Sequence, residues 1–563
     1  MDATTRETCL PGTRQSTLNN LVNYLTDPSL RPGRNVIWLR GPAGSGKSII
    51  LNTIAQHFLD LRRRGAFLFW DRNDPLNSGP PQMIRTLAFQ LAEFSPIFAA
   101  NLATRIDLSP NIATSTSDTQ FRYFIMKPLE EFARKSDLGP IVIILDAFDE
   151  CGTVESRREL LGALSVGLTK LPTEFRVLIS SRDEPDIRDA LSRLKVDTWD
   201  VPVGDATTAS DISHYLRRQI ANALPRFEGY NLRPNWPGEE AIKKLVDQSD
   251  GLFTWASTAI RFIESGDPEE ILGEVLDASV QDPSLSNLYR VALTHHFHSS
   301  DKSELDAVRS ILGAMQVVRE EVTDNQLSQL LGLKLDAVQS ILSKLWPILR
   351  WDRGRPVRVF NAPLSDFFCP PDRRQDMPRP THLSLHDGLA SDCFQIMERD
   401  LKFNICGIET SYYRNQDIDG IRDHVDRAIT PALIYAARYW IDHLELGTPE
   451  SGSHPLANAI TSFINDRFLY WIEVFSATNQ MFMTPIILKK AASWARVCRL
   501  SCVTIQPTEF RPIGSRTGAS RKNIRGTGIC ECLPVSNEPK HTTHLSVCFA
   551  IRTLRICLCA ADM

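Results

Sequence analysis

Long apolar runs are absent from this sequence. No stretch of about 18 apolar residues, the length that a membrane-spanning helix needs, occurs in the chain. The first residues, Met1–Leu10, also lack the hydrophobic core of a secretory signal. We therefore expect a cytoplasmic protein with no membrane partner, whose 12 cysteines are reduced thiols rather than a disulfide framework.

Internal repeats and a strong net charge are absent too. No unit of roughly 20 to 50 residues recurs, so the chain carries no visible propeller, ankyrin or tetratricopeptide array. A net charge of -4 gives no general case for nucleic acid as a partner. The apolar content of 42 % and the charged content of 23 % are ordinary, so 563 residues should form several globular domains.

What the sequence does contain is a phosphate-loop pattern between an apolar run at 35–40 and a helical pattern at 49–55. The glycines of such a loop let backbone N–H groups surround a β-phosphate, Lys47 reaches the β- and γ-phosphates, and the Ser48 hydroxyl offers a ligand for Mg²⁺. The helix that follows adds the positive end of its dipole. We predict a site for ATP or GTP with Mg²⁺; the alternative is an unoccupied glycine-rich turn. The predicted nucleotide-binding residues of the loop are Gly41, Pro42, Ala43, Gly44, Ser45, Gly46, Lys47 and Ser48.

A second, acidic motif follows the apolar run at 141–145. Such a run is typical of a central parallel strand buried on both faces, and Asp146 then lies at its carboxyl end, where ligands bind in open α/β sheets. We expect Asp146 to hold Mg²⁺ directly or through water. Asp149 or Glu150 is then placed to orient or deprotonate the attacking water. The alternative is a loop of solvated acids.

Three more segments fit the same sheet. They are 66–70, 175–182 and a last strand at 198–203, whose proline suggests an edge or a strand end. Arg182 ends the second of them and is a candidate catalytic contact to the γ-phosphate; the alternative is an ordinary surface arginine. Together these segments predict an α/β fold of the P-loop NTPase class with a parallel sheet, followed by all-α domains.

Four segments resemble a known family. Asp146–Glu150 looks like the acidic motif of the NACHT type of STAND signalling NTPases, and Cys9–Arg14, Ile179–Arg182 and Asp250–Ala256 agree with it. Over about residues 9–490 the chain is similar to the nephrocystin-like N-terminal NACHT region of fungal NOD-like receptors. The resemblance implies a signal-transduction switch. In such a switch ADP is expected to hold a closed monomer, and exchange for ATP is expected to open it into an oligomer that triggers defence or cell death.

The resemblance also implies what is missing. The ligand-sensing part of such receptors usually is a repeat array, and the effector usually precedes the nucleotide domain. Because the sequence contains no visible repeat and the nucleotide domain begins almost at Met1, we expect both to be absent and the effector partner stays unknown.

The pattern divides the chain into six parts. The tail at the end carries seven of the cysteines and is expected either to be poorly ordered or to translate unspliced or frame-shifted sequence. The parts are a lead-in helix at 1–34, the P-loop NTPase domain at 35–205, a helical domain at 206–290, a winged helix at 300–370, a C-terminal helical region at 371–490 and a basic, cysteine-rich tail at 491–563.

Three residues outside the phosphate loop are candidate nucleotide contacts by resemblance. The family places a proline near the adenine where this chain has Phe253, whose ring is suited to stacking on a base. The family also places a histidine against the β-phosphate of ADP where this chain has Asn361, so the closed state should be held less firmly. Arg14 belongs to the segment expected to line the base pocket and set the choice between ATP and GTP.

The expected function is a slow NTPase that self-associates on binding ATP. DNA is not an expected partner, because the candidate reading helix at 335–344 offers one lysine and one aspartate. The histidines at 295, 296 and 298 lack zinc-ligand spacing and are expected to be exposed at a helix end. Three alternatives stay open: a plain P-loop ATPase, a winged-helix ATPase that works on nucleic acid, and a truncated nucleotide-binding protein that does not switch.

Overall fold

The structure of the protein is a computed structural model. It describes residues 7–29, 35–70, 79–109, 112, 115–135, 139–152, 154–168, 170–172, 174–194, 196–282, 284–359, 382–409, 414–447 and 456–497. The chain forms two compact units: unit 1 comprises Met1–Asp324 and Lys334–Arg379, and unit 2 comprises Asn325–Leu333 and Pro380–Met563. Within the described ranges, no helix combines the length and apolar character needed to cross a bilayer.

Unit 1 contains a five-stranded sheet in the order β2-β3-β4-β1-β5, with every neighbouring pair parallel. Because the strands are parallel and in register, Arg40 lies opposite Ser181 and Asp146 opposite Phe69, so the carboxyl ends form one edge. Strand β4 separates the phosphate-loop strand β1 from the acidic strand β3. The strands are β1 Val36–Arg40, β2 Arg64–Phe69, β3 Ile141–Asp146, β4 Phe175–Ser181 and β5 Asp197–Asp200.

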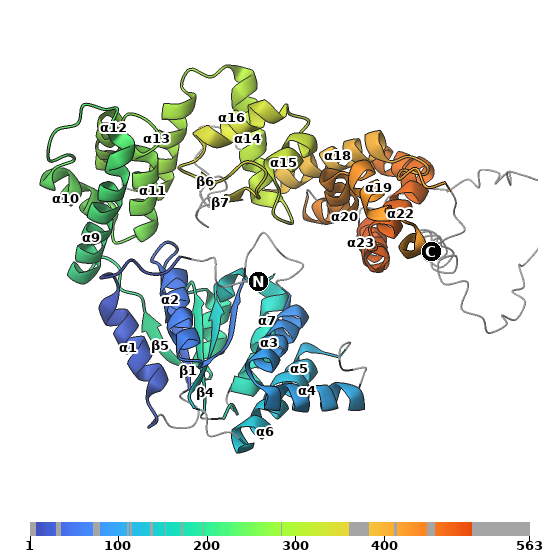
Figure 1. The fold of residues 1–563 in the computed structure, drawn as a ribbon, viewed down its shortest axis with the longest axis horizontal. Helices are drawn as coiled ribbons and strands as arrows, with labels where there is room; N and C mark the ends of the chain where they lie inside the picture. Colours follow the sequence, from blue (N-terminus) through green and yellow to red (C-terminus); the bar gives the residue numbers. More distant parts are fainter. Residues whose placement is uncertain are drawn as a thin grey trace, which may run out of the picture. The chain divides into compact units, whose positions relative to one another are not determined.

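Helices cover both faces of this sheet (Figure 1). Alternate strand residues point to opposite faces, so Ile143 of β3 joins the core beneath α3 and α7, and Ile144 joins the core beneath α1 and α2. Every residue of β3 is buried, which confirms the strand predicted at 141–145 and the α/β fold class. The helices of this part are α1 Gln15–Thr26, α2 Lys47–Asp60, α3 Pro80–Phe94, α4 Pro96–Leu108, α5 Ser117–Phe121, α6 Lys127–Lys135, α7 Val154–Leu168 and α8 Pro185–Ser192.

The last strand of the sheet is shorter than the sequence predicts. It ends at Asp200 rather than at residue 203, and its residues alternate between half-buried and exposed, as in an edge strand. The prediction of a strand at 198–203 was wrong at its end because the carbonyl of Pro202 bonds to the Arg14 side chain instead of to a neighbouring strand.

A helical part follows the sheet within unit 1. Trp255 and Phe262 of α11 are fully buried at its core, packed with side chains of the neighbouring helices. Its helices are α9 Ala206–Ala223, α10 Glu239–Gln248, α11 Phe253–Ile263, α12 Pro268–Gln281 and α13 Leu285–Phe297.

The next segment has the order of elements expected at 300–370, as far as it is described. Helix α14, Lys302–Val317, is followed by α15, Asp324–Leu330, and α16, Leu335–Lys344. Strands β6, Leu349–Arg350, and β7, Arg358–Val359, then pair antiparallel. The winged-helix assignment itself stays a prediction.

Unit 2 is helical in its described part. Helix α18, His382–Asp400, packs along α20, Pro431–Leu446, and the unit also contains α15 from Asn325 onward, α19 Ile421–Ala428, α21 Ala457–Ser462, α22 Phe468–Ala477 and α23 Thr484–Val497. The boundary predicted at residue 491 falls inside α23, because Trp494 is buried and donates its Nε1–H to the carbonyl of Leu444 at 3.0 Å. The remainder of the predicted tail, from residue 498, lies outside the described residues.

Candidate nucleotide-binding site

The phosphate loop joins the carboxyl end of β1 to the first turn of α2, as the sequence predicts. Gly44 and Gly46 adopt φ values of 81° and 92°, in the left-handed region that side-chain-bearing residues rarely occupy. A Cβ on Gly44 would also lie 2.8 Å from the side chain of Thr254. Gly46 is the N-cap of α2, so the helix presents its N-terminal amides and positive dipole end to the loop, which favours an anion.

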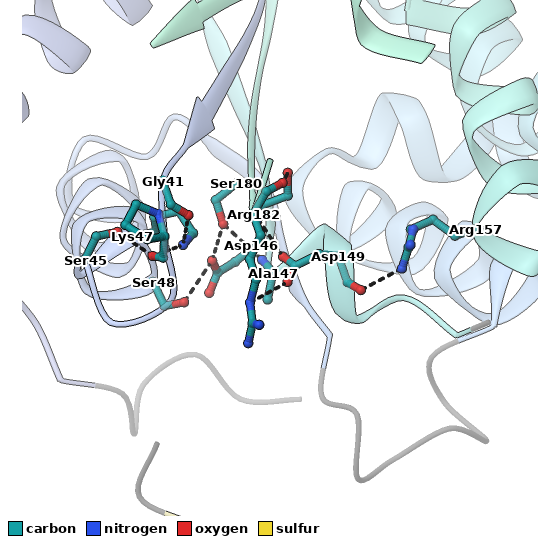
Figure 2. A network of polar contacts seen from close by, with 12 residues as sticks. Gly41, Ser45, Lys47, Ser48, Asp146, Ala147, Asp149, Arg157, Ser180 and Arg182 are labelled. Atoms are coloured by element: carbon teal, nitrogen blue, oxygen red, sulfur yellow. Dashed lines mark hydrogen bonds and ion pairs between the residues drawn. The ribbon is translucent and has the colours of Figure 1, made fainter. Parts of the chain in front are cut away.

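The side chain of Lys47 folds back over the first residues of the phosphate loop. Its Nζ donates to the carbonyl of Gly41 at 2.7 Å and to that of Pro42 at 2.9 Å (Figure 2). Burial lowers the pKa of Lys47, and the charges of Asp149 and Asp146 oppose that shift. The loop thus holds an ammonium group near the carboxylates of Asp146, Asp149 and Glu150.

Ser48 and Asp146 meet at the edge of the sheet. The Ser48 hydroxyl donates to Asp146 Oδ1 at 3.1 Å, and the hydroxyl of Ser180 on β4 donates to the same oxygen at 2.6 Å. Asp146 is fully buried. Mg²⁺ prefers hard oxygen ligands and commonly takes only one or two of them from carboxylates, so this hydroxyl and carboxylate fit the ion that the sequence predicts.

Ser180 has a second role that sequence reasoning missed. Its Oγ accepts the backbone N–H of Ala147 at 3.0 Å, at the point where the chain leaves β3 in a left-handed conformation with φ 57°. The serine therefore orients both the Asp146 carboxylate and the turn that leads to Asp149. The only sequence signal was its place in the Ile179–Arg182 segment.

Asp149 and Arg182 form an ion pair. The backbone N–H of Arg182 donates to Asp149 Oδ1 at 3.1 Å, and its Nε lies 3.3 Å from Oδ2 (Figure 2). The Asp149 side chain is 4 % exposed and that of Arg182 19 %, so neither the loop of solvated acids nor the surface arginine fits. Glu150, the other candidate base, is half-buried in the same short helix, Phe148–Glu150.

Arg14 lies far from its partners in sequence and close in space. Its guanidinium donates to the carbonyls of Pro202 and Ser45, both at 3.0 Å, and to the hydroxyl of Thr208 at 2.9 Å. The guanidinium carbon lies 5.0 Å from the centre of the Phe253 ring, a cation–π distance. The sequence predicted that Arg14 and Phe253 belong to one pocket, and the structure brings the two side chains together.

The helical part also touches the phosphate loop directly. The backbone N–H of Thr254, in the first turn of α11, donates to the carbonyl of Gly44 at 3.3 Å. Tyr215 of α9 packs edge-on against Phe253 with ring centres 5.8 Å apart, and burial raises its pKa to about 12. The loop, Arg14 and the starts of α9 and α11 therefore form one connected cluster.

Two other predictions concern Asn361 and the histidines of α13. Asn361 lies outside the described residues, so its expected place near a β-phosphate stays a prediction. The histidines at the end of α13 are not simply exposed: His295 Nδ1 lies 3.0 Å from Glu274 and His296 Nε2 lies 2.9 Å from Ser265 Oγ. In the part of the chain that the structure describes, no three histidine, cysteine or acidic side chains gather as a metal site.

Comparison with known proteins bears on the first part of the chain. Residues 14–182 match the family model described as nephrocystin 3, N-terminal. No curated protein matches the chain. Among solved structures, the crystal structure of Cdc6p from Pyrobaculum aerophilum is similar at 12 % identity over 70 % of this chain and 99 % of that one, with a TM-score of 0.28. Residues 14–182 are thus similar to the nephrocystin 3 N-terminal family, and the parallel sheet with its phosphate loop makes this part a P-loop NTPase-like fold.

Proposed function

We propose that the chain is a nucleotide-binding signalling switch of the NOD-like receptor type, which binds a nucleoside triphosphate with Mg²⁺, hydrolyses it slowly and self-associates in the triphosphate state. One observation carries the nucleotide site. Lys47 and Ser48 begin the helix that follows β1, and Asp146 ends β3. These two strands are not neighbours, yet the polar groups of the three residues gather at the same edge of the sheet.

Each residue then has a role. Lys47 exchanges its two carbonyl acceptors for phosphate oxygens, which carry more negative charge and accept stronger hydrogen bonds. Ser48 and Asp146 hold Mg²⁺, which when bound neutralises charge on the phosphates. Asp149 or Glu150 accepts a proton from the attacking water, and Arg182 stabilises charge on the γ-phosphate.

The base is proposed to bind beside Phe253. Arg14 Nε is a buried donor with no hydrogen-bond acceptor among the described groups, and it belongs to the guanidinium that lies over the Phe253 ring. A ring nitrogen or carbonyl of a base would satisfy that donor, and the aromatic side chain would add stacking. These two residues fit either adenine or guanine.

Switching is supported by the contacts between the phosphate loop and the helical part. Thr254 bonds to the loop at Gly44, and Arg14 bonds to the loop at Ser45 and to α9 at Thr208. A loop that rearranges around a γ-phosphate would strain these bonds, so the arrangement of the helices would depend on the nucleotide.

Gel filtration with light scattering tests the proposal. The full chain is run with ADP and with a non-hydrolysable ATP analogue, each with Mg²⁺, and with GDP and the GTP analogue for base preference. A shift to large assemblies only with a triphosphate supports the switch. Binding without any shift favours a nucleotide-binding protein that does not switch, and turnover well above about 1 s⁻¹ without assembly favours a plain ATPase, since ordinary kcat values centre near 10 s⁻¹.

A further inference from the structure

Arg157 is a buried arginine that the proposed function does not use. It lies on α7, on the same stripe as four leucines that pack into the core beneath the sheet, and its side chain is 8 % exposed. The next residue along the helix, Arg158, is exposed. A buried arginine needs partners for its charge, so its contacts indicate what it does. The leucines are Leu160, Leu161, Leu164 and Leu168.

All three guanidinium nitrogens of Arg157 have acceptors. Nη1 donates to the main-chain carbonyl of Asp149 at 2.7 Å, and Nε and Nη2 donate to the two carboxylate oxygens of Asp186 at 2.8 and 3.2 Å. This fork is the bidentate geometry in which arginine–carboxylate pairs are strongest. Three of the five N–H groups of the guanidinium thus donate to protein acceptors, at least one from each nitrogen, so its hydrogen bonds hold protein segments together. Figure 2 shows the side chain directed at Asp149.

The two partners belong to the loops that follow β3 and β4. Asp149 lies in the turn after β3, and Asp186 lies in the first turn of α8, four positions after Arg182. The Asp149 carboxylate in turn pairs with Arg182. Arg157 therefore closes a ring that runs through Asp149, Arg182 and Asp186, and it holds the two loops at one separation.

We propose that Arg157 is a positioning residue for nucleotide hydrolysis. By fixing the main chain at Asp149 and the start of α8, it sets where the Asp149 carboxylate and the Arg182 guanidinium stand relative to the bound γ-phosphate. It touches neither nucleotide nor metal, so it acts through those two side chains. The inference rests on the proposed nucleotide hydrolysis and adds a residue to it.

The test compares hydrolysis and binding in the full chain with Mg²⁺ and ATP. Arg157→Met removes the three hydrogen bonds, Arg157→Lys keeps the charge but not the fork, and Arg158→Met is the matched control on the same helix. We expect kcat to fall about 10- to 100-fold in Arg157→Met, since a misplacement of about 1 Å can cost that much. The affinity for a fluorescent ADP analogue should stay within about threefold of wild type, because the phosphate loop is untouched. Arg157→Lys should recover part of kcat.

Truncating one partner of a buried ion pair is strongly destabilising, so a second variant accompanies the first. Arg157→Met with Asp186→Leu removes both charges together, and circular dichroism shows which variants are folded. A folded Arg157 variant with kcat within twofold of wild type overturns the proposal, as does a loss of ADP affinity equal to the loss of kcat. Absence of turnover in the wild-type chain itself would instead overturn the proposed hydrolysis.

Discussion

Replacing Asp146 by asparagine should separate magnesium binding from nucleotide binding. The side chain is fully buried, and its Oδ1 accepts the hydroxyls of Ser48 at 3.1 Å and of Ser180 at 2.6 Å. Asparagine has nearly the same shape and retains a carbonyl oxygen for these donors, so the turn after β3 should keep its conformation. What it loses is the negative charge beside the proposed metal position.

The size of the effect follows from that loss. Changes at the groups that hold or support a metal cost about 10- to 100-fold in its affinity. That range corresponds to about 1.4 to 2.7 kcal/mol. Lys47 loses one of its three carboxylate neighbours as well, but its bonds to the loop carbonyls do not involve Asp146. Metal-free nucleotide binding should therefore change by less than about threefold.

The assay titrates Mg²⁺ into a fluorescent ADP analogue bound to the protein, with EDTA as the metal-free reference. Asp200→Asn is the control, because Asp200 also ends a strand at this edge of the sheet but is 67 % exposed and pairs with Arg40. The Mg²⁺ concentration that gives half of the fluorescence change should rise in Asp146→Asn. In Asp200→Asn it should stay at the wild-type value. The same Mg²⁺ dependence in a folded Asp146→Asn protein as in wild type would refute the assignment.

Three further predictions concern the surroundings of the site. Ser180→Ala leaves the Ala147 N–H without its acceptor and should lower the free energy of unfolding by about 1 to 3 kcal/mol, measured by urea denaturation; an unchanged midpoint would contradict this. Arg14→Met should weaken the fold by at least about 2 kcal/mol, and Arg14→Lys should not restore it, because an ammonium group cannot replace a planar fork with three acceptors. Burial lowers the pKa of His296 from 6.5 to about 4, so the unfolded chain takes up more protons in that window and stability should fall as the pH drops from 6.5 toward 4. The loss of stability with falling pH should be shallower in His296→Gln than in wild type. An equal slope in the two proteins would argue against His296 as the group whose protonation causes it.

Much of the central site was predictable because its residues follow local rules. The phosphate loop is contiguous, and an apolar run ending in an acid marks a central parallel strand. Since carboxyl ends of parallel strands share one edge, Ser48 and Asp146 were expected near each other before their contact at 3.1 Å was known.

The rest depends on contacts that no local pattern encodes. The insertion of β4 between β1 and β3 brings Ser180 onto Asp146, and sequence alone did not fix the strand order. Arg14 reaches Thr208 across 194 positions. For Arg157 the sequence contains one indication. The residue lies at helical spacing from the leucines of an apolar stripe, and such a position predicts a buried charge that needs a partner.

The direct test of the central claim is nucleotide binding by Lys47→Ala, measured by titration of a fluorescent ATP analogue with Mg²⁺. Lys170→Ala is the control, because that lysine is exposed in a turn outside the loop. Loss of charge-assisted hydrogen bonds to phosphate, each about 1.5 to 3 kcal/mol, should weaken binding by about 100-fold or more. Wild-type and Lys170→Ala proteins should bind alike. Equal affinity in a folded Lys47→Ala protein would contradict the nucleotide site itself.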